Sequence, residues 1–386
     1  MNKRGKFIGL SMAAGLFLAA CGGSDSSESG AATKLGDGEG QVNLVAWPAY
    51  VENGSTSPDA DWVTGFEAET GCKVNVKIGN TSDEMVTLMQ SGEYDGVSAS
   101  GDASLRLIAA GDVSPVNTDL IPNYANVYEG LKNRLWNSVD GVAYGVPHGR
   151  GANVMVYNTE AGPAPTSIRD MFESTSPYAG KISVYDAPIY IADAALYLMA
   201  TKPDLGITNP YSLDQTQFDA AIEVLKAQKP LVGQYWSLFT DQMAALEGGT
   251  VTLGTSWQIV VNLSKGNGAK IEATKPSEGA TGWSDTWMLS SKAKNPNCMY
   301  MWMNHIVSPA ANAAATEYFG EAPSNAKACD LTKNKDHCAN FHAGDESYFE
   351  DVWYWTTPTA VCLDGRKDVE CVPFTEWVNA WNELRA

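Results

Sequence analysis

The sequence predicts an α/β protein of two lobes, each a mixed sheet flanked by helices, with a ligand cleft between the lobes. Three observations lead to this fold class. The chain has 386 residues, enough for more than one hydrophobic core. Two stretches, near 42–98 and 181–254, alternate between strand-like and helix-like patterns. A segment rich in glycine, 145–151, lies between these stretches and suggests where one lobe gives way to the other.

The spacing of hydrophobic residues predicts the helices and strands of each stretch. The first reads as strands at 42–46, 73–78 and 94–98, separated by helices at 61–70 and from Thr81 or Ser82 to Gly92. The second reads as a strand at 181–185, helices at 191–200, 213–228 and 241–247, and a strand at 250–254. Strands that alternate with helices predict parallel sheets with crossover helices.

The N-terminus has the layout of a secretory signal. Three basic residues among the first six precede an apolar run, 7–20, that is too short to span a bilayer. The run leads into LAACG at 18–22, which resembles a bacterial lipobox. We therefore expect 1–20 to be a signal peptide, Cys21 to carry the lipid and the polar segment 21–41 to be a flexible tether. An ordinary signal peptide with an incidental cysteine is the alternative.

The charge balance restricts the possible partners. The formal net charge is −19, and it becomes more negative when the basic leader is removed. Such a chain repels nucleic acid and anionic lipid and attracts cations, although most of these carboxylates are expected on a solvated surface. We expect an exported monomer that faces the periplasm or the outer cell surface. It would meet the membrane through its lipid anchor only and would bind no nucleic acid.

Six cysteines follow Cys21: Cys72, Cys298, Cys329, Cys338, Cys362 and Cys371. An even number in an oxidising compartment favours disulfides. The spacing suggests two short loops, closed by Cys329 with Cys338 and by Cys362 with Cys371, although the sequence leaves other pairings open. A zinc site made by Cys329, His337, Cys338 and His342 is the alternative. It lacks a CxxC motif, and no metal is expected.

Aromatic, hydroxyl and carboxylate side chains follow the predicted strands. They are Trp47 and Tyr50, Ser100 and Asp102, Tyr185 and Asp186, and Trp257. Ligands of open α/β sheets bind at the carboxyl ends of the strands, so these side chains are candidates for one site. A tryptophan after a strand can also be a core residue. Asp102 can equally be the N-cap of a helix at 104–110.

Five short motifs carry a family resemblance. They are W-x-x-Y at Trp47 and Tyr50, YDGVSAS at 94–100, an aspartate at Asp186, G-x-x-W at 254–257, and W-x-D at Trp283 and Asp285. Together they resemble the spermidine/putrescine-binding family, the substrate-binding lipoproteins of ABC importers. The resemblance implies a periplasmic-binding-protein-like fold of type II. Lobe 1 would be 42–148 with 286–322, and lobe 2 would be 149–285 with 323–386.

The resemblance also implies a function and a set of ligand-binding residues. The protein would bind a polyamine-like cation such as putrescine or spermidine, deliver it to ABC permease subunits and need no cofactor. The implied ligand-binding residues are Trp47, Tyr50, Ser100, Asp102, Asp186, Trp257, Trp283, Asp285 and Glu321. Carboxylates, chiefly Asp285 and Asp186, would hold ammonium groups, and aromatic faces would cover the methylenes.

The chain departs from the family pattern at three positions. Ile189 replaces an acid, Glu321 replaces an aromatic residue, and Asp102 stands where a tyrosine is common. Carboxylates are moved rather than lost, so the departures keep a cation-binding site but leave the particular amine open. Arg150 is expected to form a structural ion pair, and Trp287 is expected in the core.

Two other functions remain as alternatives. One is an enzyme, but the chain has only four histidines and lacks the motifs that pair a nucleophile with a base, so we expect none. The other is a binding protein for another amine, an amino acid or a sugar, because aromatic walls also stack on sugars.

Overall fold

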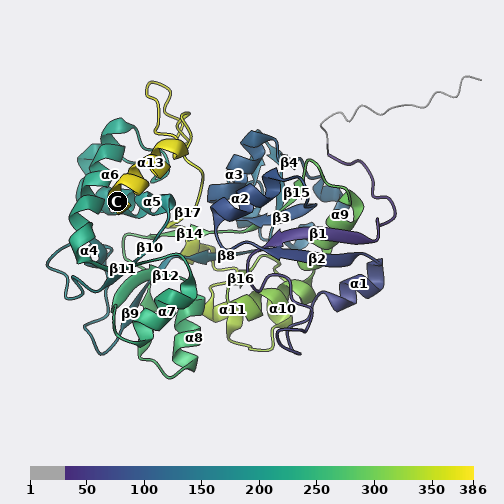
Figure 1. Ribbon diagram of the computed structural model, residues 1–386, viewed down its shortest axis with the longest axis horizontal. Helices are drawn as coiled ribbons and strands as arrows, with labels where there is room; N and C mark the ends of the chain where they lie inside the picture. Colours follow the sequence, from purple (N-terminus) through teal and green to yellow (C-terminus); the bar gives the residue numbers. More distant parts are fainter. Residues whose placement is uncertain (1–30) are drawn as a thin grey trace, which may run out of the picture.

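The computed structural model describes residues 31–386, and it shows two α/β halves side by side (Figure 1). Each half contains one twisted sheet with helices packed against it, so the predicted fold class is confirmed. The signal peptide and Cys21 lie outside the described residues. Within 31–386, no helix combines the length and apolarity needed to cross a bilayer.

The first sheet has the strand order β2-β1-β3-β15-β4, with β7 also paired to β15. Its strands are β1 (Gln41–Ala46), β2 (Lys73–Ile78), β3 (Gly96–Ala99), β4 (Val113–Ser114), β7 (Gly145–Pro147) and β15 (Thr286–Ser290). Strands β1, β2 and β3 are parallel, whereas β15 runs antiparallel to its neighbours. The helices of this half are α1 (Thr64–Thr70), α2 (Ser82–Gln90), α3 (Gly101–Ala110), α9 (Pro296–Ile306) and α10 (Pro309–Phe319).

The second sheet has the order β11-β10-β12-β9-β13. Its strands are β9 (Val154–Asn158), β10 (Ile182–Tyr185), β11 (Val232–Trp236), β12 (Leu253–Ser256) and β13 (Ile271–Thr274). The helices here are α4 (Arg169–Phe172), α5 (Ile191–Thr201), α6 (Gln215–Gln228), α7 (Phe239–Glu247), α8 (Gln258–Gly266) and α13 (Phe374–Arg385). Asp214 and Gln217 form a capping box at the start of α6, which explains why that helix begins there.

A third, short sheet lies between the two halves, and it positions the site. Its order is β16-β8-β14-β17, with β8 (Gly149–Ala152), β14 (Ala280–Trp283), β16 (Ala322–Pro323) and β17 (Val352–Tyr354). The chain leaves the first sheet after β7 and enters this one at β8. In the opposite direction it leaves β14 and enters the first sheet at β15. The two connections, β7 to β8 and β14 to β15, lie side by side. The His148 amide in the first donates a 2.8 Å hydrogen bond to the Asp285 carbonyl in the second.

Several smaller elements lie outside the three sheets and their helices. They are the hairpin β5 (Ser138–Val139) and β6 (Val142–Ala143) and the short helices α11 (His337–Asn340) and α12 (Glu346–Phe349). Trp287 is fully buried in the core under the first sheet, as expected.

Two local expectations are corrected. Helix α3 begins at Gly101 rather than at 104, because Ser100 has the extended backbone of an N-cap, so Asp102 is not the N-cap. The flexible tether was expected to reach residue 41, but Ala32 and Leu35 pack against the first core and Glu39 accepts hydrogen bonds from the Asn297 and Cys298 amides. Those contacts tie the segment just before β1 to the start of α9.

Three disulfides join all six cysteines that follow Cys21. They are Cys72–Cys298, Cys329–Cys338 and Cys362–Cys371, so the two short loops suggested by the spacing are present. The zinc alternative is wrong, because the thiols of Cys329 and Cys338 are bonded to each other.

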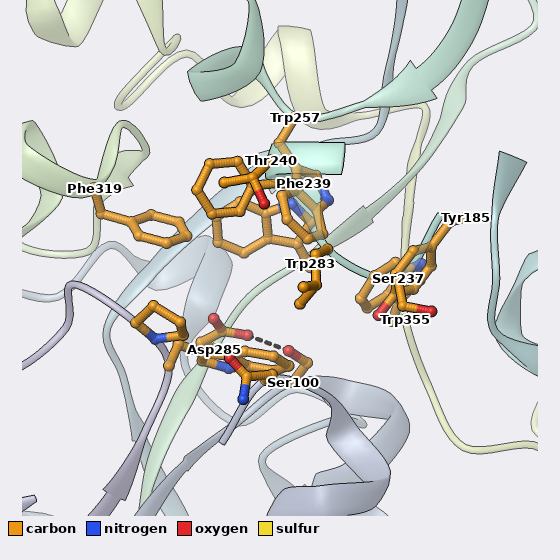
Figure 2. Close-up of a pocket in the computed structure, with 14 residues that line it drawn as sticks. Ser100, Tyr185, Ser237, Phe239, Thr240, Trp257, Trp283, Asp285, Phe319 and Trp355 are labelled. Carbon is orange, nitrogen blue, oxygen red and sulfur yellow. Dashed lines mark hydrogen bonds between the residues drawn. The ribbon is translucent and has the colours of Figure 1, made fainter. Parts of the chain in front are cut away.

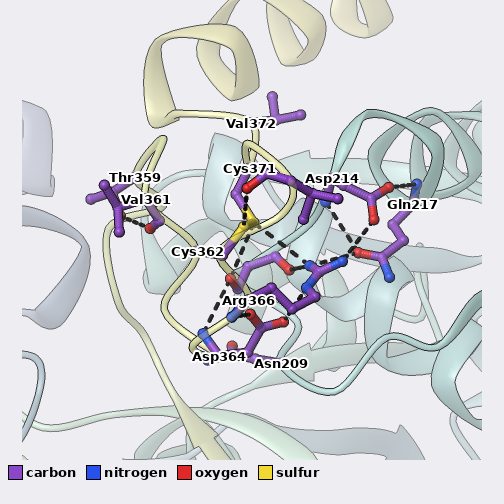
Figure 3. The surroundings of a disulfide bond; sticks show 12 residues. Asn209, Asp214, Gln217, Thr359, Val361, Cys362, Asp364, Arg366, Cys371 and Val372 are labelled. Atoms are coloured by element: carbon purple, nitrogen blue, oxygen red, sulfur yellow. Dashed lines mark hydrogen bonds and ion pairs between the residues drawn. A yellow bond between two sulfur atoms is a disulfide. The ribbon is translucent and has the colours of Figure 1, made fainter.

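The surroundings of the Cys362–Cys371 bond show how a short loop is held to the second half (Figure 3). Arg366 lies within the loop and its guanidinium donates to the Asp214 carboxylate at 2.7 Å and to the Ser212 carbonyl at 2.7 Å. The loop therefore docks on the residue that caps α6.

We predict that the long-range disulfide contributes more stability than the short ones. Replacing Cys72 and Cys298 together by serine reopens a span of 226 residues, whereas replacing Cys362 and Cys371 reopens 9. The chain-entropy model gives the first pair an advantage of about 3 kcal/mol in the free energy of unfolding. Urea unfolding of both double variants measures the difference. Equal losses for the two variants would contradict the prediction.

Candidate ligand-binding cavity

A cavity of about 300 Å³ lies where the two halves face each other. Its lining comes from both halves and from the β14–β15 crossing: Trp47, Pro48, Asn80, Ser100, Tyr185, Ser237, Leu238, Phe239, Thr240, Trp257, Trp283, Asp285, Phe319 and Trp355. Figure 2 shows the aromatic rings around the space, with the Asp285 carboxylate at its edge. The volume is at the lower end of the range for small-molecule sites.

The walls of the cavity are aromatic because strand ends deliver rings to it. Tyr185 is the last residue of β10, and its ring is parallel to that of Trp355, with centroids 5.8 Å apart. Trp283 is the last residue of β14 and meets Phe319 edge-on at 6.0 Å. A side chain at Gly151 would collide with the Trp283 ring, since a Cβ there would lie 2.6 Å from it. The glycine therefore leaves room for the indole.

Asp285 is the charged residue among those that line the cavity. Its carboxylate accepts hydrogen bonds from the Tyr50 hydroxyl at 2.6 Å and from the Ser100 hydroxyl at 2.5 Å, the latter drawn as a dashed line in Figure 2. Burial raises the pKa of Asp285 to about 6, although both hydrogen bonds act to lower it. At neutral pH the cavity therefore has one negative charge facing aromatic walls.

A second carboxylate lies behind Asp285, away from the cavity. Glu321 is fully buried, and its Oε2 is 3.4 Å from the Tyr50 hydroxyl. Its Oε1 is 3.3 Å from Nε2 of His148, which is also fully buried. Burial, followed by the charge of Asp285, raises the pKa of Glu321 well above its usual range, and burial lowers the pKa of His148 to about 3. Both shifts favour the neutral form of each group.

Asp102 and Asp186 line a separate cavity of about 100 Å³, which shares Tyr185 and Ser237 with the larger one. The Asp186 carboxylate accepts hydrogen bonds from Arg385 Nε at 3.0 Å and from Trp381 Nε1 at 3.0 Å. Asp186 therefore does not lie beside Asp285 in the main cavity and is paired with Arg385 of helix α13, while its role as an ammonium anchor stays a prediction. Asp102 accepts a hydrogen bond from Ser82 at 3.0 Å, and burial raises its pKa to about 6.

The nine predicted ligand-binding residues fall into three groups. Trp47, Ser100, Trp257, Trp283 and Asp285 line the main cavity, Tyr50 and Glu321 lie behind Asp285, and Asp102 and Asp186 line the small cavity. The four aromatic residues missing from that prediction are Tyr185, Phe239, Phe319 and Trp355. Tyr185 was already a candidate by its place at a strand end, whereas the other three follow no motif.

Arg150 forms a structural ion pair, as expected, but not with a carboxylate of the cavity. Its Nη2 lies 2.7 Å from Glu346, and its guanidinium stacks over the Phe349 ring at 3.8 Å. The cation therefore faces away from Asp285 and does not cancel the charge there.

Two α/β halves, joined by crossing strands around one cavity, define a solute-binding protein. The chain belongs to the bacterial extracellular solute-binding protein family, whose model matches residues 61–340. The members of this family bind solutes and are not enzymes, which confirms the expectation that this chain is not an enzyme.

Individual relatives agree with the predicted resemblance. The putrescine-binding periplasmic protein SpuD of Pseudomonas aeruginosa (strain UCBPP-PA14) is 26% identical over 314 residues, covering 75% of this chain and 80% of that protein. The spermidine/putrescine transporter substrate-binding protein PotD of Streptococcus pneumoniae has a TM-score of 0.68 at 17% identity, covering 89% and 97% of the two chains. The glucopine complex of MotA from A. tumefaciens B6 has a TM-score of 0.66 at 17% identity, covering 90% and 100%. The predicted family is confirmed, and its named relatives include periplasmic proteins.

A further carboxylate lies behind the aromatic wall. Asp193, in α5, is almost fully buried and accepts a hydrogen bond from the Thr281 hydroxyl at 3.1 Å. Burial raises the pKa of Asp193 to about 7. The folded state therefore binds this proton more tightly than the unfolded state does.

We predict that Asp193→Asn changes how stability depends on pH. The pKa of Asp193 is higher in the folded than in the unfolded state, so its protonated carboxyl favours folding. This contribution to the free energy of unfolding is complete below the unfolded pKa of about 4 and is lost as pH rises toward 7. The variant keeps a neutral side chain, so relative to the parent it should gain about 1 kcal/mol or more between pH 5 and pH 8. Urea unfolding at both pH values checks this. A parent–variant difference that does not change with pH would contradict it.

Proposed function

We propose that the protein is the extracytoplasmic solute-binding component of an ABC importer, and that its solute is a polyamine-like cation such as putrescine or spermidine. The observation that carries the proposal is that Asp285 faces an aromatic cavity with no other charged residue in its described lining. A cation gains there a charge-assisted hydrogen bond to the carboxylate and contact with ring faces. An anion would meet Asp285 without a compensating positive charge.

The magnitudes favour a small organic amine. Each cation–π contact contributes about 0.5–2 kcal/mol, and each buried methylene about 0.8 kcal/mol. The four methylenes of putrescine, at about 3 kcal/mol in total, together with one ammonium on Asp285 then offset an association cost of several kcal/mol. The second ammonium would point toward Asp102, which lines the small cavity that shares Tyr185 and Ser237 with the main one and has no basic hydrogen-bond partner among the described residues.

The relatives named for putrescine or spermidine support this choice of amine. The alternative is another amine, an amino acid or a sugar, since a relative of the same fold holds glucopine and rings can stack on sugars. We further propose a monomer without cofactor, tethered by lipid at Cys21 and delivering its solute to permease subunits. It would face the periplasm or the outer surface of the cell.

A thermal-shift screen tests the solute class. Putrescine, spermidine, butylamine, amino acids, sugars and dicarboxylates are compared on the full mature chain. We expect the melting temperature to rise with amines and to stay unchanged with dicarboxylates. A shift with sugars and none with any amine would overturn the proposal.

We predict that Asp285→Asn weakens putrescine binding by about tenfold or more, roughly 1.4 kcal/mol, because it removes the charge that pairs with the ammonium. The matched control is Asp186→Asn, which should change the affinity by less than about threefold because Arg385 already neutralises that carboxylate. Isothermal titration calorimetry measures both constants, and circular dichroism confirms folding. Equal effects of the two variants would remove Asp285 from its proposed role.

We predict that amine affinity falls in acid. Since the pKa of Asp285 is about 6 in the ligand-free site, protonation below that pH removes the charge that the amine needs. Affinity should drop about tenfold for each pH unit well below 6. Putrescine titrations between pH 4.5 and pH 7 measure how the affinity changes with pH, and Asp285→Asn should abolish this dependence. A parent protein whose affinity is the same across that range would contradict the prediction.

A further inference from the structure

We infer that Asp285 and Glu321 share one proton in the ligand-free protein, and that a cation bound at Asp285 displaces this proton to solvent. The inference rests on the proposed function, because it concerns the same carboxylate. It assigns Glu321, which does not line the cavity, as a positioning residue that determines the charge the solute meets.

The two carboxylates are bridged by one hydroxyl in a dry environment. Tyr50 lies 2.6 Å from Asp285 and 3.4 Å from Glu321 through the same oxygen atom. Tyr50 and Glu321 are fully buried, and Asp285 is 4% exposed. Two negative charges that contact the same buried hydroxyl repel each other strongly, so one proton held between them is the stable arrangement.

The elements packed around the pair supply little positive charge. Ser100 at the end of β3 donates only a neutral hydrogen bond to Asp285, and His337 of α11 contacts the Glu321 main-chain carbonyl at 2.9 Å. No lysine or arginine in residues 31–386 forms an ion pair with either carboxylate. The single basic group facing them is His148, between β7 and β8, at 3.3 Å from Glu321.

His148 does not supply that charge. Its Nδ1 accepts a hydrogen bond from the Trp287 indole at 3.2 Å, so this nitrogen carries no proton. The imidazole is therefore neutral, with its proton on Nε2, which lies 3.3 Å from Glu321 Oε1. Neither of these two atoms has a hydrogen-bond partner in the described part of the chain, so their contact is an electrostatic one and not a hydrogen bond.

The direction of the hydrogen bonds places the shared proton. A tyrosine hydroxyl has one proton, and the short contact shows that Tyr50 donates it to Asp285. The Tyr50 oxygen can then only accept from Glu321, which requires a protonated Glu321 carboxyl. Two donors in series result, the Glu321 carboxyl to Tyr50 and Tyr50 to an ionised Asp285.

The close approach of the backbone supports this arrangement. Glu321 precedes β16, which pairs with β8, and its carboxyl lies against Gly149. A Cβ at position 149 would lie 2.3 Å from Glu321 Oε2, so the glycine makes room for the carboxyl group. The buried acid is thus held in place by the same crossing strands that hold Asp285.

Solute capture then exchanges a cation for a proton. An ammonium at Asp285 lowers the energy of a second negative charge nearby, so Glu321 passes its proton to the Tyr50 oxygen while the Tyr50 proton moves through Asp285 to cavity water. Glu321 becomes ionised, Tyr50 and Asp285 regain their starting protonation, and one proton enters solvent. No other bond is made or broken, and no further reactant is required.

Infrared spectroscopy of the ligand-free protein tests the shared proton directly. At pH 7.5 the parent should show protonated-carboxyl C=O absorption beyond that of Asp193, and this additional band should be absent from Glu321→Gln, whose amide can still donate to Tyr50. The matched control, Glu350→Gln, changes an exposed glutamate and should keep the band. A parent spectrum without that band would overturn the inference, whatever the solute proves to be.

Calorimetry tests the exchange. Putrescine titrations at pH 7.5 in two buffers of different ionisation heat count the protons released. We expect about 0.5–1 proton per putrescine for the parent and for Glu350→Gln, and about zero for Glu321→Gln. Glu321→Gln should still bind putrescine through Asp285, more weakly than the parent, because no second negative charge develops.

The possible results separate the inference from the proposed function. Putrescine binding with no proton release from the parent, or with equal release from Glu321→Gln, would overturn the exchange but leave cation binding in place. A band present in a protein that binds no amine would support the shared proton and would overturn both the exchange and the proposed function.

Discussion

The hydrogen bond from the His148 amide to the Asp285 carbonyl marks the point on which the rest of the site depends. Two antiparallel chain segments, β7–β8 and β14–β15, leave one sheet and enter another at this place, and a third segment joins them through β16. A backbone that changes sheets must break its strand pairing. The peptide groups freed there pair with each other, and the side chains at the break are directed into the space between the halves.

This constraint explains why the charge and the aromatic rings meet. Trp283 ends β14, and Asp285 follows two residues later, before β15 begins. Rings from the two halves approach the crossing from either side: Trp47 from the first, and Tyr185 and Trp257 from the second. Any relative motion of the halves would change the distance between these rings, while Asp285 would keep its place on the connection. The carboxylate is therefore suited to hold a solute as the halves close.

The buried polar groups behind Asp285 show why its carboxylate can stay ionised although it is almost fully buried. A lone carboxylate with so little exposure would be costly to ionise. Tyr50 and Ser100 both donate to it, which offsets part of that cost, whereas Glu321 and His148 stay neutral beneath it. Elsewhere Asp186 and Arg150 are paired with Arg385 and Glu346, so neither leaves an uncompensated charge near the cavity.

The sequence by itself determined the fold class, most elements and the residues at strand ends, because hydrophobic spacing and helix caps are local properties. It also indicated Trp283 and Asp285 through their motif. Only the tertiary structure decided which carboxylates face the solute. Asp186 follows a strand as the motif requires, but α13 brings Arg385 against it from nearly two hundred residues away. Phe319 and Trp355 joined the wall, and Glu321 was placed behind Asp285, because packing between distant segments leaves no periodic signal in the chain.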